Sequence, residues 1–242
     1  MKNVITLFFL LFIVSACQKE EFDILNLNNN RISALGHGGM GIGYTYPMNS
    51  FESILNCLNL GADGTEIDVQ MTKDSVLVAF HDKSLEHSTN VSGQIFSKKW
   101  NEISDAVYKD PPYTNYRLIT LDELFSNISN LTEYTFFLDC KNFNPDTSST
   151  YLNTFNDALI KIIDKYNLEN NVYIEFKRTD LIRSLRIKRS DLKIFVYKNF
   201  NLALEVVNEF QLQGITTSVD NISKEEVMKA HSNGTMVAVF NT

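Results

Sequence analysis

The sequence predicts an α/β fold, a TIM (β/α)8-type barrel, and three observations lead to this prediction. Apolar segments rich in β-branched and aromatic residues alternate with amphipathic helical segments over roughly 200 residues, which favours a parallel sheet. No Gly-x-Gly-x-x-Gly motif follows the first predicted strand, which argues against a dinucleotide-binding sheet. Charged side chains and histidines end several of the apolar segments, as they do at the mouth of a barrel. We therefore expect one barrel domain over residues 31–242.

The composition supports a single domain with a sizeable core. The chain has 242 residues, 44% of them hydrophobic, and it contains no low-complexity linker after its first segment. Its formal net charge is -7. An acidic chain lacks the basic face that phosphate backbones require, so we expect no nucleic-acid partner and no binding to an anionic membrane surface.

The first residues are typical of a secreted lipoprotein. Residues 1–16 contain a lysine near the start and an apolar run too short for a bilayer span, and we interpret them as a lipoprotein signal peptide. Val-Ser-Ala-Cys resembles a bacterial lipobox, which implies cleavage before Cys17 and lipidation of its sulfur. Residues 17–30 would then be a lipidated tether, and Gln-Lys-Glu-Glu at its start resembles a surface-export signal. The alternatives are an uncleaved anchor and a plain signal peptide.

The leader implies a place in the cell. We expect a lipid-anchored lipoprotein of the cell envelope, held by its lipid in the outer membrane or on the surface of a Gram-negative bacterium. Two cysteines remain in the mature chain, Cys57 and Cys140. Both are predicted to be buried thiols rather than members of a disulfide scaffold.

The barrel domain begins with a short apolar strand at 31–39 that runs into a glycine-rich turn. A helix is predicted over 48–62. Asn49 or Ser50 can cap its start, apolar residues recur at helical spacing, and Gly61 ends it.

The stretch 61–82 carries the clearest chemistry in the sequence. Glu66 and Asp68 are two residues apart, so on an extended strand their side chains leave the same face about 7 Å apart. The link 70–75 is too short for a crossover helix and predicts a tight arm or a hairpin. A second apolar run follows and ends at His81, which is typical of a strand that delivers chemistry at its C-terminal end.

The pattern changes after this stretch. Residues 83–117 lack clean periodicity and are interpreted as an excursion on the loop side of the barrel. Thr120 then caps a helix predicted over 121–131. The alternation continues with strands at 135–141, 172–177, 192–198, 214–220 and 236–242 and with helices at 151–168, 179–189, 203–212 and 223–234.

Ionisable residues gather at the predicted strand ends, which converge on one mouth in a barrel. Carboxylates without cysteine ligands suit a hard cation, Mg²⁺ or Ca²⁺. Two histidines suit a general acid and a general base, and a lysine would offset charge on a phosphorane-like transition state. The set is compatible with phosphodiester cleavage, and it comprises His37, Glu66, Asp68, His81, Asp139, Lys141, Glu175 and Lys177.

These motifs resemble those of the glycerophosphodiester phosphodiesterase family. The likeness rests on Gly-His-Gly-Gly around His37, on the Pro-x-Asn-Ser helix start at 47–50, on the long run 61–74 and on the His-Asp pair at 81–82. It is specific over residues 31–141 and thinner afterwards. It implies a TIM barrel whose substrates are small-molecule glycerophosphodiesters, cleaved to glycerol 3-phosphate and an alcohol in a metal-dependent reaction.

The resemblance also implies a role for each matching residue. His37 and His81 match the catalytic histidines, Glu66 and Asp68 match metal ligands, and the strand that ends Asp-Cys-Lys matches the family's Glu-x-Lys strand. The implied catalytic residues are therefore His37, His81 and Lys141, and the implied metal ligands are Glu66, Asp68 and Asp139.

Three departures from the family pattern stand out. Gly38 takes the place of the arginine that usually follows the first histidine, so Lys141 or Lys177 would have to bind the phosphate instead. Asp139 is one methylene shorter than the usual glutamate. The segment 236–242 resembles a late strand of the family, so the barrel is expected to be incomplete at the C-terminus.

Glu175, with Lys177, is either a substrate-binding residue or part of a supporting ion pair.

Two other functions remain open from the sequence. One is a related cyclising lyase, which would release a cyclic phosphate as its final product. The other is a non-catalytic surface lipoprotein that binds phosphodiesters or glycans, which Gly38 and the expected incomplete barrel would favour.

Overall fold

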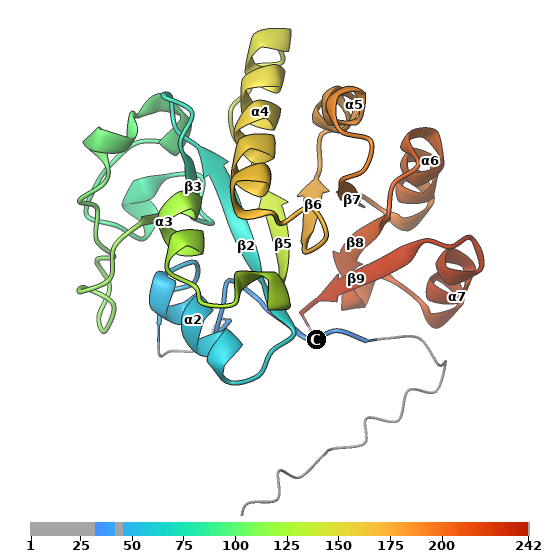
Figure 1. Ribbon diagram of the computed structural model, residues 1–242, viewed down its shortest axis with the longest axis horizontal. Coiled ribbons are helices and arrows are strands. Elements are labelled where there is room, and N and C mark those ends of the chain that lie inside the picture. The colour runs from blue at the N-terminus through green and yellow to red at the C-terminus, as the bar shows by residue number, and fades with distance from the viewer. Residues whose placement is uncertain (1–31, 42–45, 242) are drawn as a thin grey trace, which may run out of the picture. The chain divides into compact units, whose positions relative to one another are not determined.

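The computed structural model describes residues 32–41 and 46–241 (Figure 1). The predicted signal peptide, the tether and Cys17 lie outside the described residues. All described strands and helices belong to one compact unit, Ser33–Thr242. None of the helices in the described ranges is long and apolar enough to cross a membrane.

One sheet organises this unit. Its strands follow the order β4-β3-β2-β5-β6-β7-β8-β9, and β1 pairs with the first residues of β2, on the same edge as β3. The pairs from β1 through β2 and β5 to β9 are parallel, whereas β3 and β4 are antiparallel additions. The strands are β1 Leu35–Gly36, β2 Gly64–Met71, β3 Leu77–Ala79, β4 Ile119–Thr120, β5 Thr135–Cys140, β6 Val172–Phe176, β7 Lys193–Tyr197, β8 Gly214–Ser218 and β9 Met236–Phe240.

Helices follow the parallel strands, as the alternating pattern predicted (Figure 1). Five of them begin at a serine, threonine or asparagine whose side chain accepts a hydrogen bond from a backbone N–H of the first turn. The helices are α2 Phe51–Asn59, α3 Leu121–Ser126, α4 Ser149–Tyr166, α5 Thr179–Lys188, α6 Phe200–Phe210 and α7 Lys224–Ser232.

The alternation of side chains along the strands separates the core from the site. Ile67, Leu138 and Ile174 are fully buried in the main apolar core with residues of the surrounding helices. Their neighbours along the strands point to the opposite face, since successive side chains of a strand alternate. Glu66, Asp68, Asp139 and Glu175 therefore share the inner face of the sheet.

The segment from β3 to β4 builds a small apolar cluster of its own. It contains three short 3₁₀ helices, Leu85–His87, Ile95–Ser97 and Trp100–Glu102, in place of longer elements. Their apolar side chains pack with those of β3, and the cluster comprises Val78, Phe80, Leu85, Ile95, Ile103, Ala106, Tyr108 and Leu118. The cluster holds the chain on both sides of His81.

The helix predicted over 121–131 is shorter than expected. It ends at Ser126, and Asn127 closes it with a backbone N–H bond to Leu124. Asn130 then adopts a left-handed conformation with φ of 53° before a 3₁₀ turn. A left-handed residue cannot continue a right-handed helix, so the apolar residues after Ser126 pack without helical backbone.

Candidate active site

A cavity of about 600 Å³ opens on the inner face of the sheet. Its lining combines acidic, basic and imidazole groups with aromatic rings from β5, β7 and β9. Seven residues singled out from the sequence line this cavity: His37, Glu66, His81, Asp139, Lys141, Glu175 and Lys177. Asp68 is fully buried beside it.

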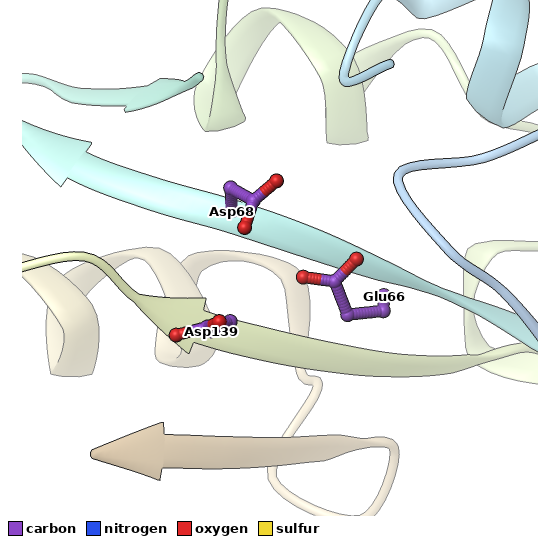
Figure 2. Close-up of side chains that lie close together, drawn as sticks. All are labelled: Glu66, Asp68 and Asp139. Carbon is purple, nitrogen blue, oxygen red and sulfur yellow. The ribbon is translucent and has the colours of Figure 1, made fainter. Parts of the chain in front are cut away.

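Three carboxylates form the acidic centre of the site (Figure 2). β2 and β5 are parallel neighbours, and Asp68 lies directly opposite Asp139 in the register. Glu66 precedes Asp68 by two residues on the same face of β2. One oxygen from each of the three side chains lies within 4.8 Å of the others. The two-residue spacing in the sequence thus produces a compact cluster, as expected.

The strand-end prediction needs correction for β2 and β3. Glu66 and Asp68 lie in the middle of β2, because this strand extends beyond its neighbours and turns back as an antiparallel hairpin. The returning strand β3 ends next to Asp68, whose carbonyl accepts the N–H of Phe80 at 2.9 Å. His81 follows directly, so it reaches the site on a strand that runs opposite to the parallel ones.

Asn49 holds Asp68 in place from both sides. Its side-chain amide donates to Asp68 Oδ2 at 2.6 Å, and its side-chain carbonyl accepts the backbone N–H of Asp68 at 2.9 Å. Asn49 is buried and has a φ of 65°, a left-handed conformation that asparagine tolerates better than most residues. Ser50, not Asn49, accepts the capping bond of α2. The two residues weighed as alternative caps therefore have separate tasks.

Gly38 supports Glu66 with its backbone. Its N–H donates to Glu66 Oε2 at 2.8 Å, and its φ is +59°. A Cβ at this position would come within 2.8 Å of Met48 Cε and 2.9 Å of Met48 Cβ. An arginine cannot occupy this turn without strain, which gives a physical reason for the departure from the family pattern.

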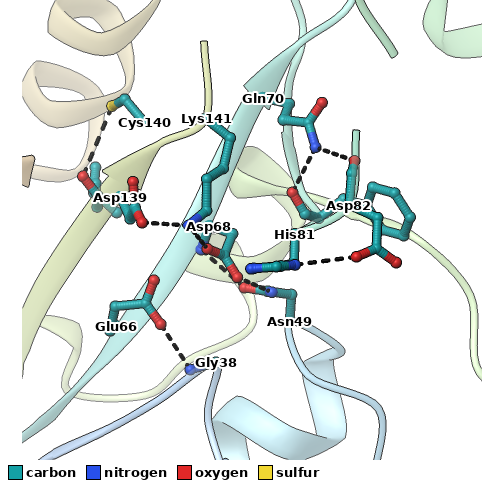
Figure 3. A network of polar contacts seen from close by, with 12 residues as sticks. Gly38, Asn49, Glu66, Asp68, Gln70, His81, Asp82, Asp139, Cys140 and Lys141 are labelled. Atoms are coloured by element: carbon teal, nitrogen blue, oxygen red, sulfur yellow. Dashed lines mark hydrogen bonds and ion pairs between the residues drawn. The ribbon is translucent and has the colours of Figure 1, made fainter. Parts of the chain in front are cut away.

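Lys141 bridges two of the three carboxylates (Figure 3). Its ammonium lies 3.0 Å from Asp68 Oδ1 and also donates to Asp139 Oδ2. Burial acts to lower the pKa of Lys141, but the two carboxylates raise it by more, so the net shift is upward. Lys141 therefore stays charged and offsets part of the negative charge of the cluster.

Glu66 is the carboxyl of the acidic centre whose negative charge is least compensated by its surroundings. Burial raises its pKa well above the ordinary value, and the nearby Asp68 and Asp139 carboxylates raise it further. The Gly38 N–H and Lys141 offset only part of this shift. Among the described residues, Asp139 Oδ1 is buried without a hydrogen-bond partner. A trio of oxygen ligands with surplus negative charge and an unpaired oxygen fits a hard divalent cation.

His81 is oriented by its neighbour Asp82 (Figure 3). His81 Nδ1 lies 3.1 Å from Asp82 Oδ1, and the other oxygen of Asp82 accepts the hydroxyl of Ser88. Gln70 fixes the backbone around His81 by donating to the carbonyls of Phe80 and Asp82, at 2.8 Å in each case. A carboxylate on Nδ1 leaves Nε2 as the nitrogen available for proton transfer.

His37 lines the cavity directly after β1. Burial lowers its pKa, while the negative charge of Asp68 acts in the opposite direction. Its ring meets the edge of Phe240 from β9, with the ring centroids 6.4 Å apart. The two histidines thus approach one cavity from different strands.

Glu175 on β6 and Lys177 directly after this strand lie next to the acidic centre. Glu175 is directly opposite Asp139 in the register. Burial raises the pKa of Glu175 to about 8, with a further contribution from Asp139. Lys177 has its ammonium 4.4 Å from the centre of the Tyr197 ring. Both residues line the cavity, and no ion pair between them is present in the described structure.

Some residues of the site were not identified from the sequence. The cavity is also lined by Tyr197, Thr216 and Phe240, but the sequence pattern does not distinguish them from ordinary strand residues. For the two aromatic residues the only signal was their place near predicted strand ends. The contact of Asn49 with Asp68 had no local signal, because 19 residues separate the two partners.

The chain is similar in sequence to known proteins. The sequence model of the glycerophosphoryl diester phosphodiesterase family matches residues 40–242. A glycerophosphodiester phosphodiesterase from Caldanaerobacter subterraneus is 30% identical over 151 residues, or 61% of this chain. The chain spans 60% of the length of that relative.

Solved structures agree with this match. A phosphodiesterase from Oleispira antarctica, solved with the product sn-glycerol-3-phosphate, has a TM-score of 0.75 at 17% identity, covering 87% of this chain and 85% of its own. A glycerophosphoryl diester phosphodiesterase from Parabacteroides distasonis has a TM-score of 0.66 at 26% identity, covering 86% of this chain and 72% of its own. The predicted TIM-type α/β barrel fold is confirmed by these likenesses.

The clamp on Asp68 leads to a first prediction. Replacing Asn49 by alanine removes both hydrogen bonds to Asp68 and places alanine at a left-handed φ. We expect the free energy of unfolding to fall by about 2–4 kcal/mol in urea titrations. Asn167→Ala is the matched control, because Asn167 is also left-handed, with φ of 54°, but is exposed. It should cost about 1 kcal/mol. Equal losses in the two variants would contradict the clamp.

The buried acid Glu175 leads to a second prediction. Its folded pKa of about 8 exceeds the ordinary value of 4.5. Between these values the folded protein binds more protons than the unfolded chain, so stability falls as pH rises. With EDTA present, the free energy of unfolding should drop between pH 5 and 8 more steeply than in Glu175→Gln, by up to about 1.4 kcal/mol per pH unit.

The control for this measurement is Glu205→Gln, since Glu205 is an exposed glutamate on α6. This variant should reproduce the slope of the wild-type protein. Parallel curves for the wild type and Glu175→Gln would show that Glu175 does not titrate in this window.

Proposed function

The chain belongs to the glycerophosphoryl diester phosphodiesterase family, and from this membership we propose that it hydrolyses glycerophosphodiesters to glycerol 3-phosphate and an alcohol. One observation carries the proposal: a carboxylate trio, a charged lysine and two histidines meet at one cavity. The product bound to the Oleispira antarctica phosphodiesterase supports the choice of glycerol 3-phosphate.

A divalent cation, Mg²⁺ or Ca²⁺, is part of the proposal. Glu66, Asp68 and Asp139 would hold it, since their oxygens are close together and carry surplus negative charge. When bound, such a cation polarises a phosphoryl oxygen and offsets charge in the transition state. Lys141 would add a fixed positive charge beside the same oxygens.

The two histidines would handle the protons. One imidazole accepts a proton from the attacking water or glycerol hydroxyl as the new bond to phosphorus forms, and the other donates a proton to the departing alkoxide. Asp82 would keep His81 in one orientation and tautomer for this exchange. His37 follows β1 and His81 follows β3, so the two imidazoles would come to the phosphodiester from different strands.

We further propose that the mature protein is a lipid-anchored lipoprotein of the cell envelope, in the outer membrane or on the surface of a Gram-negative bacterium. The support is the lipobox-like sequence that ends at Cys17. Labelling with radioactive palmitate in a bacterial host should mark the wild-type protein and not Cys17→Ser. An unlabelled wild type would contradict the anchor and leave the proposed chemistry untouched.

The enzymatic proposal predicts a clear outcome for histidine substitution and metal removal. His37→Ala and His81→Ala should each lower kcat on glycerophosphodiesters by about 100-fold or more. EDTA should abolish activity, and Mg²⁺ or Ca²⁺ should restore it. The products can be followed by ³¹P NMR.

His231→Ala is the control for these variants, because His231 lies on α7 and does not line the cavity. It should keep wild-type activity. A cyclic phosphate as the final product would identify the cyclising lyase instead. If the wild type binds the diester saturably but does not turn it over with any divalent ion, it is a binding protein.

A further inference from the structure

β6 repeats the acid-x-lysine pattern of β5. Asp139 on β5 and Lys141 directly after it line the cavity, and so do Glu175 on β6 and Lys177 directly after it. Asp139 and Glu175 lie directly opposite each other in the parallel register. The cavity therefore has two neighbouring acid–lysine pairs, of which the first belongs to the acidic centre.

The two lysines have different surroundings. Lys141 is held by two carboxylates. Within the described part of the chain, no carboxylate lies within ion-pair distance of Lys177, and its ammonium rests on the ring face of Tyr197 at 4.4 Å. Lys177 is exposed at the cavity wall. Its hydrogen-bond donors are therefore available to a ligand.

Two buried polar side chains complete this part of the wall. Glu175 is 4% exposed and Thr216, on β8, is 5% exposed, and both line the cavity. The Thr216 hydroxyl faces Glu175 and acts to lower the pKa of that carboxyl, although no hydrogen bond of ordinary geometry to Thr216 Oγ1 is present among the described residues. A hydroxyl that lines a cavity beside a carboxyl can exchange such a weak contact for a hydrogen bond to a bound molecule.

Aromatic rings enclose the same region. Phe137 lies on β5, and Tyr197 and Phe240 contact each other edge to face, with centroids 5.6 Å apart. They offer flat apolar surface around the polar groups of Glu175, Lys177 and Thr216. A mixture of donors, acceptors and rings is suited to a ligand with several hydroxyl groups on a carbon skeleton.

We propose that Glu175, Lys177 and Thr216 form a subsite for the alcohol half of the diester, and that this subsite selects a polyhydroxylated alcohol over a quaternary ammonium alcohol. The inference rests on the proposed phosphodiesterase function. Hydroxyl groups can donate to Glu175 and accept from Lys177 and Thr216. A quaternary ammonium group has no donor, is repelled by Lys177 and finds the face of Tyr197 already covered.

The test compares kcat/KM for glycerophosphoglycerol with kcat/KM for glycerophosphocholine. The wild-type enzyme should favour glycerophosphoglycerol by about tenfold or more. Thr216→Val removes the hydroxyl with little change in shape and should lower this ratio by about tenfold, the effect of one lost hydrogen bond. Thr217→Val is the matched control, since Thr217 is the next residue of β8, is 6% exposed and does not line the cavity. It should leave the ratio unchanged.

Lys177→Met gives a second, independent measurement. Because Lys177 is exposed, this variant should fold, and thermal melting checks that it does. Loss of the ammonium should lower the same ratio by improving the use of glycerophosphocholine. A wild-type preference for glycerophosphocholine or glycerophosphoethanolamine would overturn the inference, and so would equal ratios in Thr216→Val and Thr217→Val. Absence of turnover with every diester would instead refute the proposed function itself.

Discussion

The repulsion within the acidic centre is the constraint on which the rest of the site depends. Glu66, Asp68 and Asp139 have oxygens within 4.8 Å of one another, where two unit charges repel by roughly 3 kcal/mol at an effective dielectric constant of about 20. Donors from three other segments reduce this cost: the ammonium of Lys141, the side-chain amide of Asn49 and the backbone N–H of Gly38. Burial and, after it, the charges of Asp68 and Asp139 still raise the pKa of Glu66. A divalent cation would remove the remaining repulsion by taking the place of a proton on Glu66. The turns around the site hold the three carboxylates together for such a cation.

The length of β2 couples the acidic centre to the second histidine. Because β2 extends beyond its parallel neighbours, it supplies two carboxylates from its middle and still has residues left to pair with β3. The hairpin returns the chain to the level of Asp68, where the Phe80 N–H meets its carbonyl. The apolar cluster of the segment after β3 then holds Phe80 from the other side. A shift of this hairpin by one residue would turn His81 to the opposite face, so the register of one short antiparallel pair determines the distance between the histidine and the carboxylates.

Much of this arrangement could be predicted from the sequence, because it depends on local patterns. The two-residue spacing of Glu66 and Asp68, and of Asp139 and Lys141, determines a common face wherever the strand lies, and the alternating elements indicate the barrel. What failed depends on contacts distant in the chain. Asn49 was predicted as a possible helix cap. Its hydrogen bonds to Asp68 could not be predicted, because they form only when α2 packs beside β2. His81 was expected at the mouth where the strands end, whereas the hairpin brings it back to the level of Asp68. The helix after Thr120 was predicted too long, because its apolar residues continue beyond the turn at Asn127 that ends the helix.

The balance of charge links the missing arginine to the choice of alcohol. Gly38 is required by its left-handed turn and its contact with Met48, so this turn supplies no cation. Lys141 and a divalent cation together would match the three carboxylates of the acidic centre. Among the described residues that line the cavity, Lys177 is then the lysine left to match the single charge of a phosphodiester. A substrate whose alcohol is uncharged completes this balance, whereas a cationic alcohol would need a further carboxylate charge in a buried site. The glycine at position 38, which takes the place of the family's arginine, therefore favours a neutral, hydroxyl-bearing alcohol beside Lys177.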